Sequence, residues 1–141
     1  MIEIEYWRDM VDKKEKILII EDDMYINKMY QLKLNLEGYE VEIAENGKVG
    51  VEKTKSFKPD IVLLDILMPE MDGFEVLKVL KADSEMKKIP VLIMSNLGQE
   101  DHIQKGKEMG AVGYIVKTQY TPAKVVETIK EVLERGKTKA K

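Results

Sequence analysis

The chain has 141 residues, of which 44% are apolar and 35% charged, and its formal net charge is −3. This size and composition predict one globular domain with a single core and exclude a disordered chain. Lys and Arg form no stripe and no apolar stretch is long enough to span a membrane, so neither nucleic acid nor a membrane is an expected partner. The absence of cysteine excludes disulfides and thiolate metal sites, and without a signal peptide we expect a cytoplasmic location.

The first elements alternate between strand and helix. Lys16–Ile20 is an apolar run typical of a buried strand, and the acidic residues Glu21–Asp23 follow it directly. Apolar residues at mixed three- and four-residue spacings then predict a helix over Ile26–Leu36, which ends at Gly38 as helices commonly do. Tyr39–Ile43 alternates apolar and polar residues, as a half-covered edge strand does.

The middle of the chain repeats this order. A short helix is predicted over Gly47–Ser56, and a continuous apolar run, Ile61–Leu64, follows. Such a run, rich in Val, Ile and Leu, is typical of a strand covered on both faces of a parallel sheet. It ends in a carboxylate, Asp65, and a loop with Pro and Gly leads to a helix that begins near Gly73. Asp65 is therefore expected where open α/β sheets bind their ligands.

The last elements also end in polar residues. Ile89–Met94 is a predicted strand with Ser95 at its end, and the mostly polar segment Glu100–Met109 is a predicted helix. Ala111–Val116 is the fifth predicted strand, and Lys117 follows it.

Five strands alternating with five helices predict an α/β fold: a single doubly wound (βα)5 domain whose five-stranded parallel sheet has helices on both faces. The last helix is predicted over Pro122–Arg135, with Thr121 as its N-cap. We expect the domain to cover residues 16–135. Residues 1–15, which include the only tryptophan, form an N-terminal extension that is either disordered or an amphipathic arm, and residues 136–141 form a frayed basic tail.

Polar residues at several strand ends form a candidate site. In a doubly wound sheet Glu21–Asp23, Asp65, Ser95 and Lys117 converge at one edge. Clustered carboxylates repel one another unless a cation lies between them, and carboxylate oxygens suit Mg²⁺. A metal, a lysine and a hydroxyl together can stabilise a phosphoryl group on a carboxylate.

These residues resemble the receiver domain of bacterial two-component response regulators, which has the flavodoxin-like fold of chemotaxis protein Y. The resemblance covers residues 16–135 and combines several spaced motifs, which are highly specific together. They are the acidic turn after the first strand, Asp65 with Met68-Pro69 and Asp72-Gly73, Ser95, and Tyr114–Lys117.

The resemblance implies Mg²⁺-dependent acceptance of a phosphoryl group at Asp65. The donor would be a phosphohistidine on a sensor histidine kinase or phosphotransfer protein. Asp22 would bind Mg²⁺ directly and Glu21 through water, and Asp65 and the backbone carbonyl of Leu67 would complete the set of protein ligands.

The resemblance also assigns the remaining site residues. Ser95 and Lys117 would contact the phosphoryl oxygens, and Tyr114 matches the aromatic residue that turns inward when Ser95 moves. An aromatic residue in a strand is also commonly a core residue, so both interpretations of Tyr114 stay open. We interpret Asp23 as a helix cap and His102, on a polar helix, as a solvated surface residue.

Four residues depart from the family pattern. Thr118 stands where proline usually follows the lysine, and Asn96 stands where a small residue usually follows the switch hydroxyl. Leu67 and Leu97 stand two residues beyond Asp65 and Ser95, where polar residues are common. None of the four removes a catalytic atom, and the two leucines predict slow loss of the phosphoryl group.

The leading functional hypothesis is a stand-alone signalling switch rather than an enzyme. A downstream protein would read the face of the fourth helix, fifth strand and fifth helix, around Glu100–Met109, Tyr114 and Val125–Glu131. An aspartyl-phosphate phosphatase is a second hypothesis, although Leu67 stands where such enzymes commonly place an acid. A receiver-like interaction module that is never phosphorylated is a third. No Gly-x-Gly-x-x-Gly follows the first strand, which argues against a dinucleotide-binding domain.

Overall fold

A computed structural model describes residues 14–139, so the predicted N-terminal extension lies almost wholly outside the described residues. None of the helices in this part of the chain is both long and apolar enough to pass through a membrane. The elements in chain order are β1 (Lys16–Ile20), α2 (Met24–Leu36), β2 (Glu40–Ala44), α3 (Gly47–Phe57), β3 (Ile61–Leu64), α4 (Gly73–Ala82), the 3-10 turn η1 (Met86–Lys88), β4 (Val91–Ser95), α5 (Glu100–Glu108), β5 (Gly113–Val116), the 3-10 turn η2 (Lys117–Gln119) and α6 (Pro122–Lys139).

The five strands form one parallel sheet in the order β2-β1-β3-β4-β5. The predicted doubly wound (βα)5 fold is therefore confirmed, and β2 lies at the edge, as its alternating sequence predicts. After β1 the chain first adds β2 on one side and then β3 on the other. The order of strands reverses at this point, and ligands of open α/β sheets bind outside the strand ends at such a switch.

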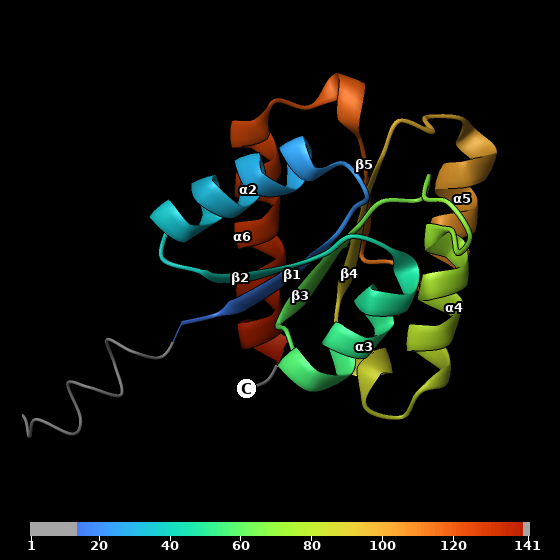
Figure 1. Cartoon of the computed structure of the whole chain (residues 1–141), viewed down its shortest axis with the longest axis horizontal. Coiled ribbons are helices and arrows are strands. Elements are labelled where there is room, and N and C mark those ends of the chain that lie inside the picture. The colour runs from blue at the N-terminus through green and yellow to red at the C-terminus, as the bar shows by residue number, and fades with distance from the viewer. Residues whose placement is uncertain (1–13, 140–141) are drawn as a thin grey trace, which may run out of the picture.

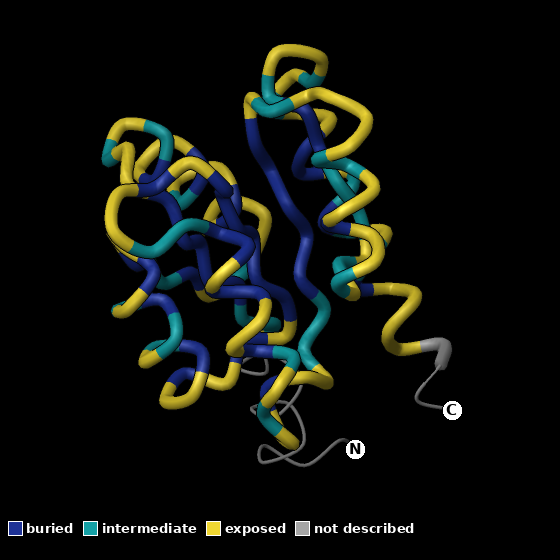
Figure 2. Tube along the Cα trace, turned by 90° about the vertical axis from the view of Figure 1, so that its right-hand side faces the viewer, coloured by how far each residue is buried: buried dark blue, intermediate teal, exposed yellow. Residues whose placement is uncertain are grey.

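Helices cover both faces of the sheet. Figure 1 shows α2 and α6 on one face and α3, α4 and α5 on the other. The strands between these layers are buried along most of their length, as Figure 2 shows. Burial on both faces explains why the central strands are continuous apolar runs instead of alternating ones.

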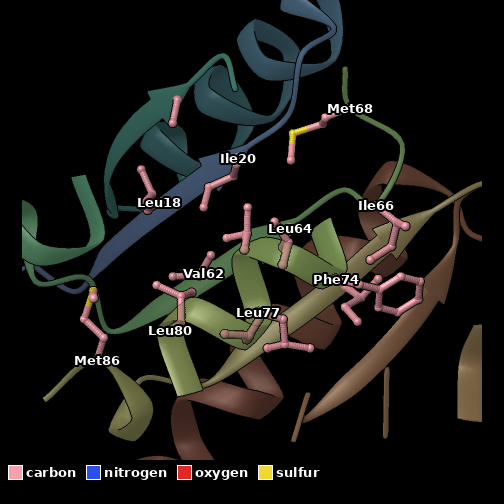
Figure 3. Packing of buried hydrophobic residues seen from close by; sticks show 14 of the residues in the cluster. Leu18, Ile20, Val62, Leu64, Ile66, Met68, Phe74, Leu77, Leu80 and Met86 are labelled. Atoms are coloured by element: carbon pink, nitrogen blue, oxygen red, sulfur yellow. The ribbon is translucent and has the colours of Figure 1, made fainter. Parts of the chain in front are cut away.

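Two apolar clusters hold the layers together. Ile17 and Ile19 of β1 belong to the cluster beneath α2 and α6, whereas Leu18 and Ile20 belong to the cluster beneath α3 and α4. Figure 3 shows part of the second cluster, where Leu77 of α4 lies against the sheet. Each fully buried leucine or isoleucine contributes roughly 1.5–3 kcal/mol of transfer free energy, so this packing positions the strand ends firmly.

Several helices are capped at their N-termini by side chains that accept hydrogen bonds from backbone N–H groups of the first turn. Asp23 accepts hydrogen bonds from the backbone N–H groups of Tyr25 and Ile26, which confirms its interpretation as the cap of α2. Thr121 accepts one from the N–H of Lys124, which confirms its predicted role at α6. Each such cap contributes about 1 kcal/mol and sets where the loop ends and the helix begins.

Several element boundaries differ from the sequence prediction by one or two residues, and the end of α6 differs by more. Helix α6 continues to Lys139, four residues beyond the predicted end at Arg135, so residues 136–139 are helical and not a frayed tail. Gly136 costs about 1 kcal/mol in a helix, which is too little to end a long helix that is packed on the sheet. The 3-10 turn η1 was not predicted; Asp83 caps it by accepting from the N–H groups of Glu85 and Met86.

Candidate functional site

Three carboxylates gather where β1 and β3 end. Glu21 and Asp22 follow β1 and Asp65 follows β3, and one carboxylate oxygen from each lies within 4.8 Å of the others. Glu21 and Asp65 are buried, whereas Asp22 is exposed. The loops that carry them gather toward the top of Figure 1. The predicted convergence of these residues is therefore present in the structure.

Lys117 reaches this cluster from the end of β5. Its Nζ lies 2.5 Å from Oε1 of Glu21 and 3.3 Å from Oδ2 of Asp65. One ammonium group thus contacts two buried carboxylates, although it is 96 residues from Glu21 in the chain. The three carboxylates carry one negative charge each when ionised, so with Lys117 the cluster retains two negative charges.

Electrostatics at the cluster favour binding of a further cation. Burial, together with the adjacent Asp65 carboxylate, raises the pKa of Glu21 to about 8. Burial alone would lower the pKa of Lys117, but its contacts with Glu21 and Asp65 outweigh this and leave the pKa above its usual value. The lysine therefore stays charged, while Glu21 holds a proton more readily than an exposed glutamate does.

The residues present fit a Mg²⁺ ion. Within residues 14–139, Oε2 of Glu21 is buried and has no hydrogen-bond partner, and Asp22 offers an exposed carboxylate beside it. Mg²⁺ is commonly held by one or two carboxylates and keeps several waters, which this half-open cluster allows. The backbone N–H of Leu67 lies 3.4 Å from Oδ1 of Asp65. The role of the Leu67 carbonyl as a ligand stays a prediction.

The loop after Asp65 requires a glycine at its end. A Cβ atom on Gly73 would lie 2.3 Å from the carbonyl oxygen of Asp65, which is closer than any side chain allows. The N–H of Gly73 donates to the carbonyl of Ile66 at 2.9 Å, and Asp72 caps α4 by accepting from the N–H of Glu75. Asp72 and Gly73 thus hold the start of α4 against the backbone of Asp65.

Ser95 and Tyr114 meet at the loop after β4. Ser95 is fully buried, and its Oγ accepts a hydrogen bond from the N–H of Leu97 at 3.2 Å. The hydroxyl of Tyr114 donates to the carbonyl of Leu97 at 2.6 Å. Burial raises the pKa of Tyr114, and hydrogen bonding to Ser95 partly opposes the shift. Tyr114 is therefore half-buried with its hydroxyl at the Ser95 loop, and its role as a switch stays a prediction.

Gly106 of α5 provides space for the Tyr114 ring. This role of Gly106 was not predicted from the sequence. A Cβ atom there would lie 2.8 Å from Cδ1 of Ile93 and 3.2 Å from Cδ2 of Tyr114. Gly106 is the buried residue of an otherwise mostly exposed helix. A glycine inside a helix costs about 1 kcal/mol relative to alanine. We therefore attribute the glycine at this position to the close packing of α5 against Ile93 and Tyr114.

We expect Gly106→Ala to displace the Tyr114 ring. The gain in helix propensity offsets the crowding, so the free energy of unfolding should change by less than about 1 kcal/mol. The measurement is ¹⁹F NMR with 3-fluorotyrosine, in which the resonance lost in Tyr114→Phe identifies Tyr114. A shifted Tyr114 resonance is expected, with the other tyrosine resonances unchanged. Gly136→Ala, where a Cβ atom meets nothing within 4 Å, is the matched control. An unmoved Tyr114 resonance would contradict this packing argument.

None of the four residues that depart from the family pattern belongs to the cluster of the three carboxylates and Lys117. Asn96 and Thr118 are exposed, and no peptide bond between residues 14 and 139 is cis, so the Lys117–Thr118 bond is trans. Leu67 and Leu97 line the same cleft of about 510 Å³.

His102 lines this cleft as well and is not the solvated residue that we expected. Its ring is half-buried and stacks on Phe74 of α4, with centroids 6.4 Å apart. The polar pattern of α5 predicts exposure, but it does not reveal that the first turn of the helix faces an aromatic ring.

Comparison with known proteins supports one family. The family described as "Response regulator receiver domain" matches residues 17–130. Chemotaxis protein CheY of Treponema pallidum is 42% identical over 123 residues, covering 84% of this chain and 83% of that protein. The transcriptional regulatory protein PhoP of Bacillus subtilis is 32% identical over 126 residues, which cover 89% of this chain and 51% of PhoP. The chain spans about half the length of several curated relatives that it matches.

Solved structures agree with the sequence comparison. CheY4 of Vibrio cholerae has a TM-score of 0.79 and 32% identity, with 85% of this chain and 99% of that chain covered. A CheY-like receiver domain protein from Methanospirillum hungatei has a TM-score of 0.83 and 28% identity, with 90% and 99% covered. With the family match over most of its length and this fold, the chain belongs to the response regulator receiver domain family of two-component systems.

Proposed function

We propose that this chain is a phosphorylation switch whose acceptor is Asp65. The observation that carries the proposal is the buried Asp65 carboxylate, which lies 3.3 Å from Lys117 and within 4.8 Å of two further carboxylate ligands. Lys117 would neutralise charge on a phosphoryl group that Asp65 accepts, and Ser95, at the end of β4, would donate a hydrogen bond to its oxygens. Membership of the receiver family supports this assignment.

In the proposed reaction an Asp65 oxygen attacks the phosphorus of a phosphohistidine on a sensor kinase or phosphotransfer protein. A P–O bond forms, the P–N bond breaks, and the imidazole nitrogen leaves with the electron pair and takes a proton from water. Glu21, Asp22, Asp65 and the Leu67 carbonyl would hold Mg²⁺, which would supply charge neutralisation when bound. The protein's own part is to align the Asp65 oxygen and to place Lys117 beside it.

We propose that phosphorylation changes the conformation of one surface of the domain, and that this change is the output of the switch. Tyr114 joins the Ser95 loop to β5, and α5, β5 and α6 together form the face that a downstream protein would read. The similarity to CheY of Treponema pallidum over 83% of that protein supports a stand-alone receiver, and we propose the cytoplasm as its location. This function requires catalysis only at the chain's own Asp65.

The direct test is incubation of the chain with Mg²⁺ and a small acyl phosphate, followed by intact mass measurement. We expect one added phosphoryl group in the presence of Mg²⁺ and none when the metal is chelated. An unchanged mass with the metal and donor present would favour the alternative of a receiver-like interaction module.

We expect Asp22→Ala to weaken Mg²⁺ binding by about tenfold or more, because it removes the exposed carboxylate of the ligand set. Calorimetric titration with Mg²⁺ measures the effect. The variant should unfold at the same temperature as the native chain without metal, or higher, because the repulsion that the Asp22 carboxylate adds to the cluster is gone. Asp101→Ala removes an exposed aspartate of α5 and is the matched control. Equal Mg²⁺ affinity in the native chain and Asp22→Ala would rule out Asp22 as a ligand.

A further inference from the structure

The acidic turn after β1 is tied to α2 by a buried amide. Asn27 is fully buried, and its Nδ2 donates a hydrogen bond of 2.6 Å to the backbone carbonyl of Glu21. The same nitrogen lies 3.7 Å from Sδ of Met24. Asn27 therefore connects the first turns of α2 to the peptide unit between Glu21 and Asp22.

Other hydrogen bonds hold the two sides of this turn. The N–H of Glu21 donates to the carbonyl of Ala44 in β2 at 3.1 Å, and Asp23 caps α2. The contact from Asn27 secures the peptide unit in between, from which the Asp22 side chain extends. Both proposed carboxylate ligands from this turn are thus attached to a backbone that Asn27 restrains.

The carbonyl oxygen of the Asn27 side chain, Oδ1, has no hydrogen-bond partner within residues 14–139, and this indicates why asparagine occupies the position. Oδ1 is buried, and no protein group between residues 14 and 139 donates to it. A buried acceptor without a protein donor opposes folding, and an apolar side chain of similar size would avoid it. The stability of the fold alone therefore does not favour asparagine at this position. The hydrogen bond from Nδ2 to the Glu21 carbonyl, which restrains the acidic turn, is a reason for asparagine here.

We propose that Asn27 is a positioning residue for the Mg²⁺ ligands Glu21 and Asp22. The inference rests on the proposed function, because it takes the acidic turn as the metal site. Residues that orient metal ligands through a hydrogen bond commonly change metal affinity about 10–100-fold when they are replaced. Asn27 has this relation to the turn through the backbone, and it need not contact the metal.

The test compares Mg²⁺ binding and folding in Asn27→Leu and in the native chain. Leucine keeps most of the volume but removes both the Nδ2 donor and the unpartnered Oδ1. We expect Mg²⁺ affinity, measured by calorimetry and by backbone amide shifts of residues 21–23, to fall about 10–100-fold. The thermal midpoint without metal should stay within a few degrees of the native value. Phosphorylation by a small acyl phosphate should be slow at low Mg²⁺ and recover at saturating Mg²⁺.

Thr54→Val is the matched control. Thr54 is also fully buried, and its hydroxyl donates to a backbone carbonyl, that of Gly50, at 2.7 Å within α3. Its replacement should leave Mg²⁺ affinity unchanged. Asn27→Ala serves as a second variant if leucine prevents folding.

The outcomes separate this inference from the proposed function. Native affinity in a folded Asn27→Leu or Asn27→Ala chain would overturn the role of Asn27 and leave the proposed function intact. A native chain that binds no Mg²⁺ would overturn both. Equal losses in Asn27→Leu and Thr54→Val would show a general loss of packing and not positioning.

Discussion

Asp65→Asn is expected to gain no phosphoryl group when it is treated with Mg²⁺ and a small acyl phosphate, whereas the native chain gains one. A neutral amide oxygen is a far weaker nucleophile than a carboxylate, so the loss should be complete within the detection of intact mass. The side chain of Asp65 is 6% exposed and lies 3.3 Å from Nζ of Lys117, so a phosphoryl group on it would lie beside a positive charge.

Folding of this variant should be intact. Asp65→Asn removes one negative charge from a cluster that holds three carboxylates and one lysine. The repulsion between Asp65 and Glu21 falls, so the thermal midpoint should equal or exceed that of the native chain. Asp60→Asn changes the exposed aspartate just before the same strand and should be phosphorylated normally. A phosphoryl adduct that persists in Asp65→Asn would identify a different acceptor.

Replacing the two leucines at the site should shorten the lifetime of the phosphorylated state about 10–100-fold. Hydrolysis of an aspartyl phosphate needs a water in line with the phosphorus, and alignment is a large part of phosphoryl-transfer catalysis. Leu67 is 53% exposed and lines the cleft together with Leu97, so neither side chain can hold that water by a hydrogen bond. The native chain should therefore lose its phosphoryl group slowly, and Leu67→Asn/Leu97→Glu should lose it faster.

The measurement follows the phosphorylated fraction by intact mass after the donor is removed. Leu32→Glu places the same acid on an exposed leucine of α2 and should leave the lifetime unchanged. Exposed Asn96 adjoins Leu97, and its amide is the competing means of holding a water. Rapid loss in the native chain, or equal rates in the native and double-variant chains, would disprove the role given to the leucines. Slow loss would make removal of the phosphoryl group depend on a partner phosphatase or on transfer back to the kinase.

Local sequence patterns determined the elements of this fold and the edge at which the site lies. The apolar runs of β1 and β3 predict buried strands, because each strand is covered on both faces and no polar alternation is possible. Asp23 and Thr121 predict helix starts, because their side chains satisfy N–H groups within the next three residues. These contacts are short in sequence, so one stretch of chain contains the whole signal.

Contacts between distant segments could be decided only by the tertiary structure. Nζ of Lys117 is 2.5 Å from Oε1 of Glu21 because the parallel strands β1 and β5 end at the same edge of the sheet. No local sequence pattern encodes that distance. The stacking of His102 on Phe74 likewise depends on how α5 packs against α4.

Asn27 and Gly106 show the same limit. A polar residue and a glycine on amphipathic helices suggest exposure and flexibility in the sequence, yet both are buried against residues that matter for the site. Helix periodicity determines which face of a helix turns inward, but it leaves open what that face meets. Whether a residue on that face meets a backbone carbonyl, as Asn27 does, or must leave space for an aromatic ring, as Gly106 does, depends on the packing of elements that the sequence places far apart.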